Sequence, residues 1–246
     1  MAFHSALLSM FWHLCLFQEL AVIDADHQMD VCKNVFILAD LVIGVDFNMA
    51  SRVGALQKLL EDSTCPKVLI DHHHSPDENM FDLIFSKVDF SSTCELIYWV
   101  AFNTWQNDAL NQDAAKCLYT GICTDTGNFA FANGDSSLYE ATAELVKFDI
   151  KPAEIHNHIF NAFSVAKMQF FGFCINQRLR IFEKEGVAYF YLTQEDLNRF
   201  GVKESDTEGL VNYTLMMKQI HVGALIKDSQ NRGVRISLRS KNDFDV

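Results

Sequence analysis

The run Lys67-Val68-Leu69-Ile70-Asp71-His72-His73-His74 is the most informative stretch of the chain, because a short apolar segment typical of a buried strand is followed directly by an acid and three histidines. A second stretch of this kind, Leu41-Val42-Ile43-Gly44-Val45, passes into Asp46-Phe47-Asn48. In open α/β sheets, ligands bind beyond the carboxyl ends of the strands, so both polar groups are expected to face one crevice. The sequence therefore predicts two buried strands that carry a polar site at one edge of a sheet.

Helices are predicted between and after these strands. Apolar residues at helical spacing, from Val53 to Leu60, mark one helix face, and Ser92-Thr93-Cys94-Glu95 predicts a capping box at the start of the next helix. Further helices are expected at residues 112–124 and 136–148, and Pro152 is expected in the first turn of another. This alternation predicts the α/β class, with a parallel sheet that has helices on both faces.

The pattern changes near Gln177. Residues 164–177 are expected to form a helical connector. Residues 178–246 are expected to form a smaller mixed sheet whose strands are joined by polar turns. Its strands are expected at residues 180–182, 187–192, 221–226 and 234–238. The predicted organisation is a large domain at 1–163, the connector at 164–177 and a second domain at 178–246.

The composition limits the classes of function. With 246 residues, 49% of them hydrophobic, the chain can bury real cores. A formal charge of -12 argues against binding to long duplex nucleic acid, because such affinity depends on Lys and Arg that neutralise phosphates. The seven cysteines are scattered in apolar stretches, which predicts buried thiols in a reducing cytoplasm and no disulfide framework.

The apolar stretch from Ala2 to Gln18 invites a membrane or targeting interpretation. It lacks a basic leader and a small-residue cleavage site, and His4 and His13 interrupt it. We expect a buried segment and no membrane contact. Because the stretch begins at residue 1 without a polar lead-in, it is also open to interpretation as interior sequence of a longer protein.

The strand-end residues are chemically suited to a metal. A carboxylate and imidazoles brought together at a sheet edge fit Mn²⁺ or a similar ion with oxygen and nitrogen ligands. Asp46 alone would be ordinary turn chemistry, whereas three consecutive histidines after Asp71 are harder to explain as structure. A third group, residues 121–129, contains Asp125 and Gly127. By itself it could equally be part of the site or a helix C-terminus followed by a glycine turn, in which Asp125 merely binds a backbone amide.

These motifs together resemble the DHH phosphoesterases. Within that family the chain is most similar to the bacterial branch of short oligoribonucleases and 3′-phosphoadenosine 5′-phosphate phosphatases, and its second part resembles their DHHA1 domain. The resemblance covers nearly all of residues 30–246. The stretches that carry it are residues 44–52, 68–73, 90–95, 120–129, 206–212 and 235–240.

The resemblance implies a role for each motif residue. It makes Asp46 a carboxylate that bridges two metal ions, and His72 and Asp125 further ligands. His73 would face the phosphate as the catalytic histidine, and Asp71 would orient a ligand histidine by hydrogen bonding. The implied cofactor is Mn²⁺, two ions in a complete enzyme, with Mg²⁺ as an alternative. His74 is expected to be a surface residue.

Two family features are not found in the sequence. No His-x-x-Pro-Asp-x-Asp motif precedes Asp46, and Asp24-Ala25-Asp26-His27 has its residue types in the wrong order, so it is not expected to be a ligand set. The Gly-Gly-Gly-His substrate loop, which follows the region matching residues 241–246, is not reached. The chain is therefore expected to be truncated at both ends and impaired in catalysis.

The implied function is hydrolysis of short single-stranded oligonucleotides or nucleoside 3′,5′-bisphosphates by metal-activated water. Residues 217–246 hold six Lys or Arg against three Asp, and Arg239 is the predicted substrate contact, with a solvated arginine on an edge strand as the alternative. Three alternatives for the function stay open: the chain could be a polyphosphatase or pyrophosphatase, a cyclic-dinucleotide phosphodiesterase, or an inactive fragment. A homodimer also stays open.

Overall fold

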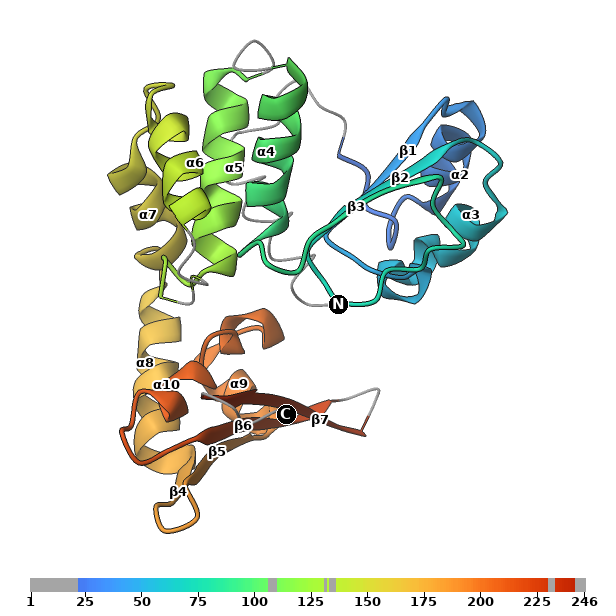
Figure 1. The fold of residues 1–246 in the computed structure, drawn as a ribbon. Helices are drawn as coiled ribbons and strands as arrows, with labels where there is room; N and C mark the ends of the chain where they lie inside the picture. The colour runs from blue at the N-terminus through green and yellow to red at the C-terminus, as the bar shows by residue number, and fades with distance from the viewer. Residues whose placement is uncertain (1–21, 106–109, 131, 133–135, 230–232, 242–246) are drawn as a thin grey trace. The chain divides into compact units, whose positions relative to one another are not determined.

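A computed structural model describes residues 22–105, 110–130, 132, 136–229 and 233–241. The apolar stretch at residues 2–18, expected to be a buried segment, lies outside the described residues. The chain divides into two compact units, Met1–Asn161 and Ala162–Val246. Each unit is drawn in Figure 1 with its helices and strands labelled.

The first unit contains the predicted parallel sheet. Its strands are β1 (Val42–Val45), β2 (Lys67–Asp71) and β3 (Leu83–Ser86), in the order β1-β2-β3, and both pairs are parallel. Two of these strands were predicted from their apolar runs, whereas β3 was not. The carboxyl ends of β1 and β2 lie side by side, since Val45 pairs with Ile70.

Helices flank this sheet, as predicted (Figure 1). Near one side lie α2 (Met29–Leu38) and α3 (Gln57–Asp62), and the side chain of Leu60 from α3 packs against Leu69 of β2 in a core with Phe47 and Phe81. On the other side α4 (Thr93–Trp105) contacts β2. The α/β class expected from the sequence is confirmed.

Three further helices pack beside α4. They are α5 (Gln112–Asp125), α6 (Ser136–Val146) and α7 (Pro152–Phe160). The ends of α5 and α6 lie within two residues of the predicted ones, and Pro152 is in the first turn of α7, as predicted. Their core includes Tyr98, Ile122 and Leu138. Because α5 ends at Asp125, this helical layer carries a candidate site residue at its end.

The prediction that the first strand is buried was wrong. Ile43 is 54% exposed and Val45 is 41% exposed. The reason is that β1 lies at the edge of the sheet formed by the described residues, with a strand neighbour on one side. Apolar periodicity identifies such a strand but does not reveal its place in the sheet.

The second unit holds a mixed sheet. Its strands are β4 (Leu179–Phe182), β5 (Val187–Leu192), β6 (Val222–Ser229) and β7 (Gly233–Ser240), in the order β4-β5-β6-β7. The β5–β6 pair is parallel and the other two pairs are antiparallel. One face packs against α8 (Val165–Phe173) and α9 (Gln194–Phe200) around Phe170 and Phe190.

The segment expected as a connector belongs to the second unit. Phe170 and Phe171 of α8 are buried in that unit's core, and the division falls between Asn161 and Ala162. A π-helical turn, Cys174–Arg178, leads from α8 into β4. The helical segment at residues 164–177 therefore packs within the second unit, because its aromatic side chains cover the sheet.

Within the described residues, helices are too short or too polar to cross a membrane.

Gly223 of β6 lies so close to Thr214 that a larger residue is not expected to fit there. A Cβ at this position would overlap Thr214 Oγ1 and lie 3.1 Å from Thr214 Cβ, and the Thr214 side chain is buried. Gly223→Ala is therefore expected to lower the free energy of unfolding by about 1–3 kcal/mol, as overpacking commonly does. Urea denaturation checks this.

The matched control is Gly172→Ala, an exposed helical position in the same unit where a Cβ would meet no atom within 4 Å. Since alanine favours helix over glycine by about 1 kcal/mol, this variant should be neutral or stabilising. Equal destabilisation by both substitutions would contradict the packing account.

Candidate functional site

The site begins where β1 and β2 end. Asp46 follows β1 with a left-handed backbone (φ 63°), and its N–H donates to the Ile70 carbonyl over 3.2 Å. Asp and Asn are among the few non-glycine residues that commonly adopt this conformation. The next loop, after Asp71, is tied to the first, because Asn48 Nδ2 donates to the His74 carbonyl at 2.7 Å.

Three of the predicted residues lie together at this edge. Asp46, His72 and His73 each offer one ligand atom, and these atoms lie within 4.8 Å of one another. His72 Nε2 lies 3.7 Å from Asp46 Oδ1, and the side chains of the two residues are 22% and 28% exposed. The group is thus partly buried but reachable from solvent.

Each imidazole is held through its Nδ1 atom. His72 Nδ1 lies 3.2 Å from the Phe90 carbonyl oxygen, which can only accept a hydrogen bond. His73 Nδ1 lies 2.7 Å from Asp71 Oδ1, and Asp71 is fully buried. Donation from both Nδ1 atoms leaves a lone pair on both Nε2 atoms, the form in which histidine binds metal or receives a proton.

This arrangement refines the expected role of Asp71. The carboxylate was expected to orient a metal-ligand histidine, and the histidine that it contacts is His73, through both the ring and the backbone N–H. His72 is oriented instead by a backbone carbonyl. The roles of these residues towards a metal remain predictions.

Asp125, the last residue of α5, lies near the same group. Burial raises its pKa to about 7, the nearby Asp46 carboxylate adds to the rise, and His72 opposes it. Asp125 is thus within electrostatic reach of Asp46 and His72, while its place in a metal site stays a prediction. Neighbouring carboxylates raise each other's pKa when no cation lies between them.

The residues fit a divalent metal. Two carboxylates and two imidazoles provide oxygen and nitrogen ligands of the kind that Mn²⁺ and related ions bind. A bound cation would also favour the ionised form of Asp125, whose pKa is otherwise high. Among the described residues Asp46, His72 and His73 are the group with ligand atoms close enough to hold one ion.

Sequence reasoning missed two polar contacts to this site. Thr93 Oγ1 donates to Asp46 Oδ1 over 2.9 Å, and the Phe90 carbonyl accepts from His72. They come from Phe90, just before α4, and from Thr93, its first residue. Residues 90–95 were singled out as a helix cap and as part of the family resemblance, but without a role at the site. Long-range contacts between a cap and a strand end leave no periodic signal in the sequence.

Other histidines lie apart from the group. His74 is exposed, as predicted, and takes part through its backbone carbonyl alone among the hydrogen bonds described. His27 pairs locally with Asp24 at 2.8 Å, and both side chains are mostly exposed. The Asp24–His27 stretch is therefore an exposed local turn.

The described cysteines are all free thiols. Burial raises the pKa of Cys123 to about 11 and that of Cys174 to about 12. These two thiols are protonated at neutral pH, so they are poor nucleophiles and poor metal ligands. The prediction of buried thiols holds for Cys32, Cys123 and Cys174, whereas Cys65, Cys94 and Cys117 are only partly buried.

Arg239, the predicted substrate contact, lies on β7 at the edge of the second sheet. It is exposed, and its guanidinium donates to the Leu238 carbonyl. Arg235 on the same strand pairs with Glu204 at 3.0 Å. A substrate role for Arg239 stays a prediction.

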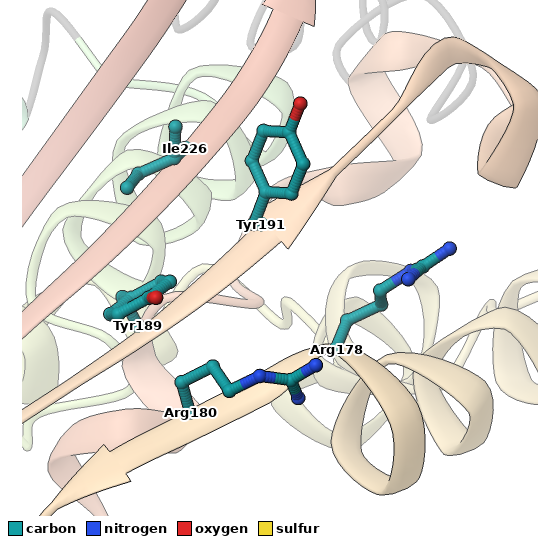
Figure 2. Close-up of a pocket in the computed structure, with 5 residues that line it drawn as sticks. All are labelled: Arg178, Arg180, Tyr189, Tyr191 and Ile226. Carbon is teal, nitrogen blue, oxygen red and sulfur yellow. The ribbon is translucent and has the colours of Figure 1, made fainter.

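A pocket of about 250 Å³ lies on the same sheet, lined by Arg178, Arg180, Tyr189, Tyr191 and Ile226 (Figure 2). Several of its polar groups are already engaged. Arg178 makes a bidentate ion pair with Asp196, at 2.9 and 2.6 Å, and the Tyr191 hydroxyl donates to Asp228. We therefore assign no chemistry to this pocket.

The raised pKa of Asp125 predicts a pH dependence in metal-free protein. A carboxyl whose pKa is higher in the folded state binds its proton more tightly there, so its stabilisation is complete below the unfolded value of 3.8 and is lost as pH rises through about 7. The wild type should therefore lose stability relative to Asp125→Asn between about pH 4 and pH 7. Urea denaturation in a chelator checks this, and parallel pH profiles for the two proteins would contradict it.

Comparison with known proteins identifies relatives of this chain. A sequence model described as "DHH family, N-terminal domain" matches residues 4–122. The "Probable bifunctional oligoribonuclease and PAP phosphatase NrnA" of Streptococcus mutans is 31% identical over 87% of this chain and 66% of its own length. The "Bifunctional oligoribonuclease and PAP phosphatase NrnA" of Bacillus subtilis is 27% identical over 76% of this chain and 60% of its own length.

A solved structure agrees over both units. The exopolyphosphatase-related protein from Bacteroides fragilis aligns with a TM-score of 0.86 and 25% identity, covering 91% of this chain and 65% of that protein. The aligned part of the chain thus spans 60–66% of these three relatives.

Proposed function

The chain belongs to the DHH family, and from this premise we propose that it is a metal-dependent phosphoester hydrolase acting on short single-stranded oligonucleotides or nucleoside 3′,5′-bisphosphates. The observation that carries the proposal is the group formed by Asp46, His72 and His73, whose ligand atoms lie within 4.8 Å of one another beyond two parallel strands. The substrate class is taken from the names of the two NrnA relatives.

Asp46, His72 and Asp125 would hold the metal. When bound, Mn²⁺, or Mg²⁺ as the second choice, supplies Lewis acidity and a water of lowered pKa, singly or as the pair of ions that the resemblance implies. Thr93 keeps the Asp46 carboxylate in place through its hydroxyl, and the Phe90 carbonyl fixes the ring of His72. The ligands are thereby oriented before substrate arrives.

His73 is the proposed catalytic histidine. Because its Nδ1 atom is engaged by the buried Asp71 carboxylate, its Nε2 atom is the one available to the phosphate. Protonated at Nε2, the ring stabilises charge on the phosphoryl oxygens and can donate its proton to the leaving oxygen. Asp71 holds the ring in one orientation through its contacts with the His73 Nδ1 atom and backbone N–H.

The second unit is proposed to hold the substrate as a DHHA1-like domain, with Arg239 as one contact. A cytoplasmic location and a homodimer are likewise proposals. The name of the Bacteroides fragilis protein favours one further candidate substrate, polyphosphate.

The test is hydrolysis of a dinucleotide, a nucleoside 3′,5′-bisphosphate and polyphosphate by the purified chain. We expect mononucleotide release that a chelator stops and Mn²⁺ restores. Hydrolysis of polyphosphate alone would replace the nucleotide proposal with the second candidate. Activity that persists in chelator after dialysis would contradict the metal-dependent mechanism.

A further inference from the structure

Glu95 is a buried carboxylate without an assigned role. It lies in the first turn of α4 and is 1% exposed. Its Oε2 atom accepts a hydrogen bond from the Ser91 N–H at 2.9 Å, and its Oε1 atom accepts one from the Ser137 hydroxyl of α6 at 2.7 Å. The two oxygens thus connect the segment before α4 to a different helix.

The segment that Glu95 holds contacts two proposed metal ligands. At one end the Phe90 carbonyl lies 3.2 Å from His72 Nδ1. At the other end Thr93 Oγ1 donates to Asp46 Oδ1 at 2.9 Å. We call residues 90–93 the ligand strap, because this short stretch fixes the orientation of side chains from both strand ends.

Helix capping alone does not explain the carboxylate. Ser92 already caps α4, since its hydroxyl accepts from the Glu95 N–H at 3.0 Å. The Glu95 side chain reaches past Ser92 to the strap at Ser91 and, on the other side, to α6. A fully buried carboxylate is costly, so a cap of this kind would ordinarily be left at the surface.

We propose that Glu95 is a positioning residue that sets metal affinity by anchoring the ligand strap to α6. The inference rests on the proposed metal site and deepens it. Without the anchor, the strap gains freedom, and the Phe90 carbonyl and the Thr93 hydroxyl no longer hold His72 and Asp46 in one arrangement. Outer partners of metal ligands typically change affinity by about 10–100-fold when they are removed.

The experiment measures Mn²⁺ affinity by electron paramagnetic resonance of free Mn²⁺, well below the unfolding temperature of each protein. Glu95→Ala is expected to bind at least about tenfold more weakly than wild type. Glu95→Gln should bind within about threefold of wild type, since its amide oxygen can accept from Ser91 while its amide nitrogen donates to Ser137. Gln thus restores the anchor without the charge.

Two comparisons separate anchoring from other causes. If the negative charge of Glu95 merely attracted the cation, Glu95→Gln would be as weak as Glu95→Ala. If Glu95 acts through the strap, Thr93→Val and Glu95→Ala should be non-additive in a double-mutant cycle, because each disturbs the same element. Unchanged affinity in Glu95→Ala, equal weakening in Glu95→Gln, or additivity with Thr93→Val would each overturn the proposal.

The remaining outcomes are also decisive. If Glu95→Ala does not fold, Ser137→Ala removes the α6 contact of the anchor and keeps Glu95 itself, and unchanged affinity in that variant overturns the proposal. If the wild type itself does not bind Mn²⁺, the metal site and this inference fail together. A wild type that binds, with unaffected Glu95 variants, rejects the inference alone.

Discussion

Asp46→Asn is expected to lower metal-dependent phosphodiester hydrolysis roughly a thousandfold, which is about 4 kcal/mol at 1.36 kcal/mol per tenfold in rate. The Asp46 carboxylate contacts both His72 and Thr93, so its charge is central to holding a cation. Asparagine adopts the left-handed backbone found at this position as readily as aspartate. The loss should therefore reflect the missing charge and not a misfolded turn.

The measurement is kcat/KM for a dinucleotide in Mn²⁺, with thermal unfolding of the metal-free proteins as a check on folding. Asp62→Asn removes an equal charge from the exposed end of α3, which leads into the amino end of β2 and not its carboxyl end, and should leave the rate within about twofold. A similar loss in both variants would point to net charge. Full activity in Asp46→Asn would remove Asp46 from the site.

His73→Ala is expected to lower kcat by about 10²–10⁴-fold, the range typical of a positioned acid or base. Its ring is held by the buried Asp71 carboxylate, which gives it a fixed direction. His74→Ala is the matched control, because His74 is the next residue and is exposed. This control should change kcat less than about twofold.

Metal affinity distinguishes the two roles that the geometry allows His73. As the residue facing the phosphate, it can be removed with Mn²⁺ affinity kept within about threefold, whereas removal of a ligand would cost far more. Loss of Mn²⁺ binding in His73→Ala would make it a ligand and correct our assignment. Equal effects of His73→Ala and His74→Ala would contradict any special role for His73.

Much of the fold could be predicted from local pattern. The apolar runs before Asp46 and Asp71 form two neighbouring parallel strands, as predicted, and the helix from Gln112 to Asp125 has nearly its predicted bounds. These elements carry strong periodicity and clear end signals, which depend on the chain's own nearby residues. The approach of Asp46 and His72 followed from the rule for strand ends, whereas Asp125, at the end of a helix, was expected at the site from the family resemblance.

Other features depend on tertiary contacts that a sequence does not display. The strand Leu83–Ser86 is short, and two of its side chains, Leu83 and Phe85, are exposed, so its run gave little signal. The partner of Asp71 could not be chosen between adjacent histidines, since that choice depends on ring orientation. The contacts of Thr93 and Glu95 join residues more than forty positions apart, beyond the reach of any local pattern.

His72 is proposed to help bind a catalytic divalent metal, and the decisive measurement is Mn²⁺ binding to wild type and to His72→Ala. Both proteins are freed of metal, titrated with Mn²⁺ and followed by electron paramagnetic resonance, with His74→Ala as the control. We predict that wild type and His74→Ala bind alike and that His72→Ala binds at least about a hundredfold more weakly. Equal Mn²⁺ affinity in wild type and His72→Ala would exclude His72 as a metal ligand.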